Sequence, residues 1–260
     1  MGLREEYRRY GVFIFDGDGV LWRGEKPIQS GIRAVRKLQK AGKIVVLLTN
    51  NSTRSRRDYK SKLQKFGVDL PLRNIYTSSY GAALYLKEKG IHRVYVVGEQ
   101  GLKEEIRGVG AKITWKAECV VAGLDRRFNY NKLSIALRLI SSGACFIATN
   151  RDTTLPTEQG LLPGAGSIIA AIETASGSRA NVTIGKPEIY LLEMISKDFD
   201  VDKEEIIMIG DRLDTDIEAA SNFGCSSILV LTGVHGLDNL RDSYVKPTFV
   251  LNNLDDLFES

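Results

Sequence analysis

The sequence predicts an α/β protein built on a parallel β-sheet. Short apolar runs alternate with segments of helical periodicity along most of the chain. The runs at 12–15 and 206–209 are apolar at four consecutive positions, which is typical of strands buried on both faces of a sheet. Four of the runs end directly at polar or charged residues, as strands do when a ligand site lies at their carboxyl ends.

The first two strands establish the direction of the sheet. After the strand at 12–15, apolar spacing predicts a helix over 30–41 with Ser30 as its N-cap, followed by a β-branched strand over 44–48. A strand, a helix and a strand in this order form a right-handed crossover with parallel strands. We therefore expect the polar residues 49–53 at the same sheet edge as the end of the first strand.

The remaining elements follow from the same reasoning. The other predicted strands are 75–77, 94–97, 112–114, 119–123, 145–148, 182–184, 206–209, 227–231 and 249–251. The other predicted helices are 54–66, 79–90, 99–107, 131–142, 167–176, 188–199, 217–223 and a terminal 254–258. A loop rich in polar and turn residues is expected over 149–166.

Composition indicates an ordinary globular protein. The chain has 260 residues, of which 43% are hydrophobic, enough for one large domain or two modest ones. The net charge of +4 is spread along the chain, whereas a nucleic-acid-binding protein usually concentrates its basic residues. No apolar run approaches membrane-spanning length, and the N-terminus lacks a signal-peptide core. We expect a cytoplasmic protein with neither a nucleic-acid nor a membrane partner.

The cysteines and histidines predict no disulfide framework and no zinc site. Cys119, Cys145 and Cys225 are odd in number and far apart in sequence, and we expect them to be buried, reduced thiols. The two histidines are too few and too isolated to build a zinc site.

The chemistry is carried by four polar groups, each at the end of an apolar run. These groups are Asp16 with Asp18, Thr49 with Asn50, Lys186, and Asp211 with Asp216. Each alone has an ordinary explanation as a turn, a helix cap or a surface residue. Together, on parallel strands, they would meet at one edge of one sheet.

Two carboxylates one residue apart repel each other, so a cation is expected between them. Asp16, Asp18 and Asp211 offer the hard oxygen ligands that Mg²⁺ prefers, together with waters and substrate phosphate. A calcium-binding EF-hand loop fits poorly, because apolar residues occupy 20–22, where further oxygen ligands would be needed. The expected cofactor is Mg²⁺.

These residue types suit the transfer of a phosphoryl group. Asp16 would attack phosphorus to give an aspartyl-phosphate, and Asp18 would act as general acid and then as general base. Lys186, Thr49 and the backbone N–H groups around Asn50 would bind the phosphate oxygens.

The four segments resemble, in the same order, the motifs of the haloacid dehalogenase superfamily of Mg²⁺-dependent aspartyl phosphatases. The segments are 16–21, 49–51, 185–187 and 210–216. The chain resembles in particular the branch of p-nitrophenyl phosphatases, phosphoglycolate phosphatases and pyridoxal phosphate phosphatases, to which 148–152 and 162–166 are also similar. This branch carries a large α/β cap between the second and third motifs.

The resemblance implies a Rossmann-like core over 1–80 plus 183–260, with a smaller α/β cap inserted at 81–182. It also implies that the backbone carbonyl of Asp18, rather than its side chain, faces the metal. Asp216 would contact the metal only through a water or through another ligand. Asp214 could take that place or bind the metal directly. An aspartate at position 18 favours a phosphatase over a dehalogenase.

The resemblance assigns substrate choice to the cap. Asn150, Arg151 and Asp152 are the candidate specificity residues, whereas Arg126 and Arg127 read more simply as a solvated rim. A homodimer through the cap is also compatible with the resemblance.

The function predicted from the sequence is Mg²⁺-dependent hydrolysis of small-molecule phosphomonoesters through an aspartyl-phosphate. p-Nitrophenyl phosphate is the expected artificial substrate, and phosphoglycolate-like, sugar and nucleotide phosphates are the natural candidates. The alternatives are a phosphotransferase or mutase and a phosphometabolite sensor without turnover. The presence of both Asp16 and Asp18 favours the enzyme.

Overall fold

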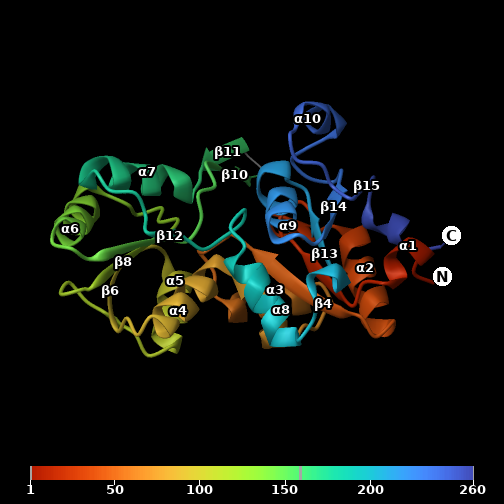
Figure 1. Cartoon of the computed structure of the whole chain (residues 1–260), viewed down its shortest axis with the longest axis horizontal. Helices are drawn as coiled ribbons and strands as arrows, with labels where there is room; N and C mark the ends of the chain where they lie inside the picture. Colours follow the sequence, from red (N-terminus) through yellow and green to blue (C-terminus); the bar gives the residue numbers. More distant parts are fainter. Residues whose placement is uncertain (1, 158–159, 260) are drawn as a thin grey trace. The chain divides into compact units, whose positions relative to one another are not determined.

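The computed structural model describes residues 2–157 and 160–259 and shows two compact units (Figure 1). The first unit consists of Met1–Thr49, Lys60–Ile75 and Lys186–Ser260. The second consists of Asn50–Tyr59 and Tyr76–Gly185 and is therefore inserted into the first. Each unit has its own parallel sheet, so the predicted α/β class is confirmed.

The first sheet has six strands in the order β15-β14-β13-β1-β4-β5. Their bounds are Phe249–Leu251, Ser226–Val230, Ile206–Gly210, Val12–Phe15, Ile44–Thr49 and Ile75–Thr77. The central strand β1 pairs in parallel with β13 on one side and with β4 on the other. All four residues of β1 are fully buried, which explains its unbroken apolar run.

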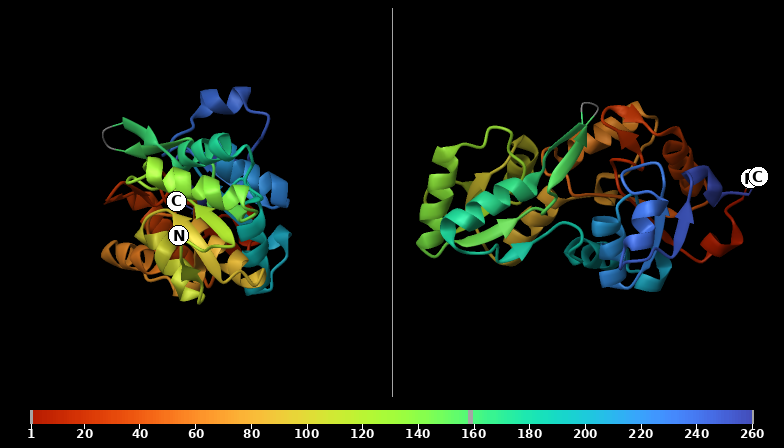
Figure 2. Two further views of the ribbon diagram at one scale, coloured as in Figure 1. Left: turned by 90° about the vertical axis from the view of Figure 1, so that its left-hand side faces the viewer. Right: turned by 90° about the horizontal axis from the view of Figure 1, so that it is seen from above.

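Helices cover this sheet, and the two ends of the chain pair with each other in the same unit. The helices here are α1 (Glu5–Arg8), α2 (Gln29–Lys40), α3 (Arg56–Lys65), α8 (Tyr190–Phe199), α9 (Glu218–Phe223) and α10 (Leu237–Asp242). Short 3-10 turns occur at Leu72–Asn74, Lys203–Glu205 and Leu254–Leu257. Leu3 and Phe258 form an antiparallel bridge, so the segments near the two termini lie side by side (Figure 2).

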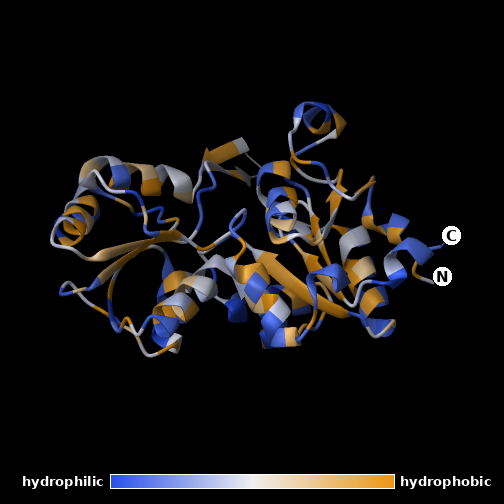
Figure 3. Cartoon of the chain, in the orientation of Figure 1, coloured by the Kyte–Doolittle hydropathy of each residue, from blue (hydrophilic) through white to orange (hydrophobic). Residues whose placement is uncertain are grey.

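The second sheet has five strands in the order β12-β9-β8-β6-β7. Their bounds are Val182–Thr183, Cys145–Ala148, Cys119–Ala122, Arg93–Val97 and Lys112–Ile113. The helices of this unit are α4 (Ser78–Glu88), α5 (Gln100–Gly108), α6 (Tyr130–Ser141) and α7 (Ala165–Ser176). α6 and α7 pack on one face of the sheet around Phe146, Ile169 and Ile172. In Figure 3 the hydrophobic residues concentrate on the strands, and the hydrophilic ones on the outer sides of the helices.

The predicted elements are present, with small shifts at their ends. Every expected strand ends within one residue of its predicted bounds, and the α-helices end within two. Three details were wrong. The strand predicted at 182–184 was expected at the same edge of the same sheet as the strands before Asp16, Thr49 and Asp211, but it is β12, an edge strand of the second sheet. α2 begins at Gln29 with Ile28 as its N-cap, so Ser30 lies buried in the first turn instead of capping it. The terminal helix is a 3-10 turn.

Two hairpins lie where the sequence predicted loops. β2 (Trp22–Arg23) pairs with β3 (Lys26–Pro27) directly after the first acidic motif. β10 (Thr154–Thr157) pairs with β11 (Gly160–Pro163) inside the predicted loop over 149–166. Both are short and contain proline, and β11 is exposed along its whole length, so neither shows the alternation that marks a half-buried strand.

The prediction of three reduced cysteines was wrong, because Cys119 and Cys145 form a disulfide. They begin the neighbouring strands β8 and β9 and stand opposite each other in the parallel register, with Cα atoms 4.4 Å apart. This adjacency depends on register between strands 26 residues apart, which spacing alone does not show. Cys225 is a free thiol, and burial raises its pKa to about 12.

No helix among the residues that the structure describes is long and apolar enough to span a membrane.

The disulfide predicts a thiol count and a stability change. After denaturation without reductant, the protein should react with one equivalent of a thiol reagent, and after reduction with three. Replacing both Cys119 and Cys145 with Ala should lower the free energy of unfolding by roughly 3–4 kcal/mol, since the bond closes a long loop. Reductant should lower the melting temperature of the native protein but not that of the variant. Three reactive thiols without reductant would contradict the pairing.

Candidate active site

The first acidic residue continues the central strand. The Asp16 N–H donates to the Ile209 carbonyl at 2.9 Å, so the backbone stays in register with β13 as β1 ends. The chain then turns through Gly19, whose φ is +83°. A Cβ at Gly19 would lie 2.2 Å from Asp211 Oδ2, so only glycine lets this turn pass the carboxylate.

The second pair of acids follows β13. Asp211 comes directly after the strand and is buried, and Asp216 is carried by a π-helical turn over Leu213–Ile217. Asp216 Oδ2 accepts the N–H groups of Asp211 at 3.2 Å and Arg212 at 3.1 Å. One carboxylate oxygen of Asp216 is thus used to shape the loop that presents Asp211.

Lys186 joins the two acidic segments. Its Nζ donates to Asp16 Oδ1 and to Asp216 Oδ1, both at 2.6 Å, and to the Leu48 carbonyl at 3.1 Å. The side chain is only 2% exposed, so these contacts replace its hydration. The ends of β1, β4 and β13 are therefore connected through one ammonium group.

Three carboxylates meet at this place. Oxygen atoms of Asp16, Asp211 and Asp216 all lie within 4.8 Å of one another. Among residues 2–157 and 160–259, no other cluster of three or more Asp, Glu, His or Cys side chains is as close. Three largely buried carboxylates, two of which pair with the Lys186 ammonium group, suit the binding of Mg²⁺, which prefers oxygen ligands. The predicted ligands Asp16 and Asp211 belong to the group, whereas the side chain of Asp18 lies outside it.

Burial, together with repulsion between the carboxylates, raises the pKa values of two acids at this site. Burial, with Asp216 and Asp211 nearby, raises the pKa of Asp16 well above its ordinary value against the opposing effect of Lys186. Burial and the Asp216 charge raise the pKa of Asp211 to about 7. Burial alone would lower the pKa of Lys186, but the two partner carboxylates outweigh it and hold that pKa above its ordinary value. A divalent cation would relieve the repulsion.

Two further predicted residues of the first unit, Thr49 and Asp214, have different surroundings. Thr49 is buried at the end of β4, next to the Leu48 carbonyl that Lys186 contacts. Asp214 is not part of the acidic group, and its carboxylate accepts two hydrogen bonds from Arg212, at 3.0 and 2.7 Å. That pairing also lowers the pKa of Asp214, in spite of partial burial.

Asn50 belongs to the inserted unit and is fixed there by two of the predicted specificity residues. Its Nδ2 donates to Asp152 Oδ1 at 3.0 Å, and its carbonyl accepts from Asn150 Nδ2 at 2.7 Å. The Asp152 N–H donates in turn to Asn150 Oδ1 at 3.1 Å. The segment after β9 therefore orients the second motif at its Asn50 end.

Arg151 has a structural partner that sequence reasoning missed. Its guanidinium donates to both oxygens of Glu173 on α7, at 3.2 and 2.6 Å, and to Thr183 Oγ1 at 3.1 Å. These bonds tie α7 to β12, the edge strand of the inserted sheet. The predicted rim residue Arg126 likewise pairs with Glu99, in an exposed contact.

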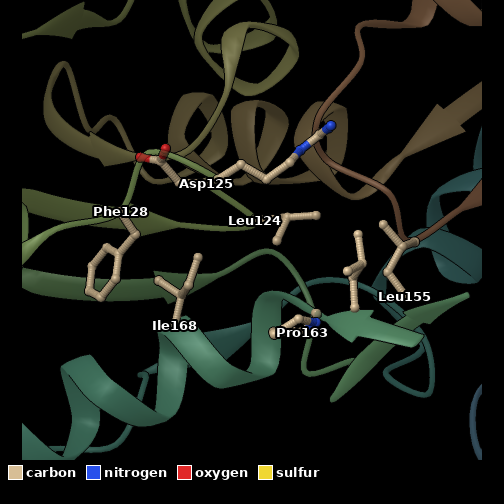
Figure 4. A pocket seen from close by; sticks show the side chains of 9 residues that line it. Leu124, Asp125, Phe128, Leu155, Pro163 and Ile168 are labelled. Carbon is tan, nitrogen blue, oxygen red and sulfur yellow. The ribbon is translucent and has the colours of Figure 1, made fainter. Parts of the chain in front are cut away.

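The inserted unit also contains an apolar cavity of about 300 Å³ (Figure 4). Leu124 and Phe128 line it from the segment after β8, Leu155 and Pro163 from the β10–β11 hairpin, and Ile168 from α7. Asp125 at its edge is neutralised by Lys132, whose Nζ lies 2.6 Å away. Sequence reasoning missed this cavity, because three of its nine lining residues come from a hairpin that was predicted as loop.

Known proteins match this chain over nearly its whole length. A family model described as haloacid dehalogenase-like hydrolase matches residues 13–112, and one described as HAD-hydrolase-like matches 183–257. Phosphoglycolate phosphatase 2 of Arabidopsis thaliana is 35% identical over 278 residues, covering 95% of this chain and 92% of its own. The 5′-nucleotidase YutF of Bacillus subtilis is 34% identical over 249 residues, covering 95% and 97%. The crystal structure of 4-nitrophenylphosphatase from Thermotoga maritima superimposes with a TM-score of 0.93 at 34% identity, covering 98% of each chain.

The fold, the acidic site and these matches define the class: the chain belongs to the haloacid dehalogenase-like hydrolases. Within that family it belongs to the branch of p-nitrophenyl and phosphoglycolate phosphatases with a large inserted α/β cap, and it is a phosphoric monoester hydrolase. The five-stranded unit is that cap.

The raised pKa values predict how stability depends on pH in the absence of metal. The ordinary aspartate pKa is 3.8, so between there and about 7 the folded state holds a proton on Asp211 that the unfolded state has released. The stability from this proton is present at low pH and is lost as the pH rises to about 7. The melting temperature in EDTA should therefore fall between pH 5 and 7.5, and Mg²⁺ should raise it more at pH 7.5 than at pH 5.

The matched variants are Asp211→Asn and Asp214→Asn. The first should flatten this pH dependence and reduce the effect of Mg²⁺, because it removes the buried titrating group. The second should keep both, because the pKa of Asp214 is lowered by Arg212 and its titration falls below the window. A melting temperature in EDTA that is constant or rises from pH 5 to 7.5 would refute the assignment.

Proposed function

We propose that this protein hydrolyses small-molecule phosphomonoesters through an aspartyl-phosphate on Asp16. The observation that carries the proposal is the position of Lys186, which holds one oxygen of Asp16 at 2.6 Å and is itself held by Asp216. This contact orients the other Asp16 oxygen as a nucleophile and keeps a positive charge beside it for an incoming phosphate.

The proposed reaction has two steps. Asp16 attacks phosphorus, the bond from phosphorus to the ester oxygen breaks, and Asp18 donates its proton to the leaving alkoxide. Asp18, now a carboxylate, takes a proton from water, which attacks the aspartyl-phosphate to release inorganic phosphate and restore Asp16. One residue would thus supply acid and then base at a half-buried position two residues after the proposed nucleophile.

Phosphate oxygens would be bound by Lys186, the Thr49 hydroxyl and backbone N–H groups beside Asn50. Lys186 and Thr49 are buried, which strengthens their interactions with a charged ligand. Mg²⁺ would be held by Asp16, Asp211 and the Asp18 carbonyl, with Asp216 in contact with it only through a water or another ligand. The ion would neutralise charge as the phosphoryl group transfers.

The substrate is proposed only as a class: small phosphomonoesters such as phosphoglycolate-like, sugar or nucleotide phosphates. Relatives named for phosphoglycolate, a 5′-nucleotide and 4-nitrophenyl phosphate support the breadth of this class. Asn150 and Asp152 remain our candidates for specificity because both contact Asn50. The paired guanidinium of Arg151 supports a structural role in addition to the specificity role predicted for it. We also propose a cytoplasmic location.

Hydrolysis of p-nitrophenyl phosphate tests the proposal. The native protein should release p-nitrophenol with Mg²⁺ and lose this activity in EDTA. Asp16→Asn should abolish release, and Asp18→Asn should lower it by roughly 10²–10⁴-fold, the usual contribution of a general acid. Asp214→Asn is the matched control, since its carboxylate pairs with Arg212 outside the acidic group, and it should retain activity within a few-fold.

The other outcomes distinguish the alternatives. Metal-dependent formation of a phosphoprotein whose phosphate passes to an added alcohol or sugar rather than to water would indicate a phosphotransferase. Binding of phosphometabolites without release of phosphate, over a range of pH and metals, would indicate a sensor. Equal activity in the native protein and Asp16→Asn would refute Asp16 as the nucleophile.

A further inference from the structure

The segment after β14 turns back over Asp211 and is not part of any of the four motifs. The Val234 N–H donates to Asp211 Oδ2 at 2.7 Å, and the His235 N–H donates to the Asp211 carbonyl at 3.1 Å. The backbone of this segment therefore holds both the side chain and the main chain of the residue that the site presents to a cation.

The approach is so close that a side chain has no room. A Cβ at Gly233 would lie 1.9 Å from Asp211 Oδ2, and one at Gly19 would lie 2.2 Å from the same oxygen. The two glycines thus flank Oδ2 from the loops after β14 and β1. With Oδ2 enclosed between them and bonded to Val234, the other oxygen of Asp211 is the one available to a cation.

Thr232 connects these two loops. Its hydroxyl donates to the Gly19 carbonyl at 2.7 Å, and its own carbonyl accepts from the Arg23 guanidinium at 2.7 Å. The segment is therefore anchored to the turn that follows Asp16. Removing the hydroxyl would free Gly19 and Gly233 to separate.

A second anchor lies at the other end of the segment. His235 Nδ1 accepts the Leu213 N–H at 2.9 Å, at the start of the π-helical turn that carries Asp216. The segment is consequently attached to the two loops that supply all the acids of the first and fourth motifs.

We propose that residues 232–235 form a positioning strap that fixes the Asp211 carboxylate for Mg²⁺, with Thr232 as its positioning residue. This inference rests on the proposed function of the acidic group as the Mg²⁺ site. Its physical basis is preorganisation: groups that orient a metal ligand without touching the metal commonly change metal affinity by roughly 10- to 100-fold.

Direct metal binding tests the strap. In calorimetric titrations of the full chain with Mg²⁺ or Mn²⁺ and no substrate, Thr232→Val should bind roughly 10- to 100-fold more weakly than the native protein. Thr232→Ser keeps the hydroxyl and should restore native affinity. With p-nitrophenyl phosphate at saturating Mg²⁺, Thr232→Val should retain the native KM and most of kcat, because the metal concentration compensates for the lost affinity.

Thr248→Val is the matched control. Thr248 also joins its hydroxyl to a backbone group of the first unit, accepting the Ser227 N–H at 3.0 Å, but away from the acids. It should leave metal affinity unchanged even where it lowers the melting temperature. Should Thr232→Val fail to fold, Gly233→Ala tests the same contact, since its methyl must displace the Asp211 carboxylate and weaken metal binding.

Failures of the two proposals can be distinguished. Native-like metal affinity in Thr232→Val or Gly233→Ala, with an active native protein, would overturn the strap alone. An equal loss of affinity in Thr248→Val would overturn it too, because the effect would then be general destabilisation. If the native protein neither binds the metal nor hydrolyses p-nitrophenyl phosphate, the proposed function and the strap both fall.

Discussion

The catalytic half of the structure depends on one buried ammonium group. Lys186 lies between Asp16 and Asp216 and contacts the last carbonyl before Thr49, so it connects the ends of three strands at once. Burying a charge is unfavourable unless it is paired and hydrogen-bonded, and here all three contacts meet that condition. Conversely, the acids could not be buried side by side without it. The site and the carboxyl edge of the sheet are therefore a single electrostatic arrangement.

The sequence predicts the strand ends because their signal is local. Asp16, Thr49 and Asp211 each end or follow an apolar run, and parallel pairing brings those three runs to one edge of the six-stranded sheet. The run before Lys186 is β12 of the other sheet, so Lys186 reaches the acids from outside that sheet. What holds the acids in place is not local. The bonds of Asp216 to backbone N–H groups, and the return of 232–235 over Asp211, depend on loop conformation that periodicity does not encode. Sequence alone thus predicts which groups meet better than it predicts how they are oriented.

The cap shows a different limit. Its strands and helices were predicted closely, yet the Cys119–Cys145 disulfide and the β10–β11 hairpin were missed. Both depend on which strand lies opposite which, and cysteine spacing or a short proline-containing strand does not reveal that. For Arg151 the limit is different again. A charged residue near a motif suggests substrate contact, but its partner Glu173 is on a helix that follows the hairpin, and only the folded cap brings them together.

The charge balance of the acidic group supports the proposal that a cation binds here together with a phosphate. Three ionised carboxylates against one ammonium leave two excess negative charges, and these would repel a phosphate dianion. Burial and, after it, the charge of Asp216 raise the pKa of Asp211 to about 7, so that protonation lowers the charge of the site in the absence of a metal. A divalent cation would cancel the excess without a proton and would leave Asp16 ionised, as its proposed role as nucleophile requires. The proposed metal dependence would then follow from the charges of this chain, because the group that repels a phosphate without a cation would become neutral with one.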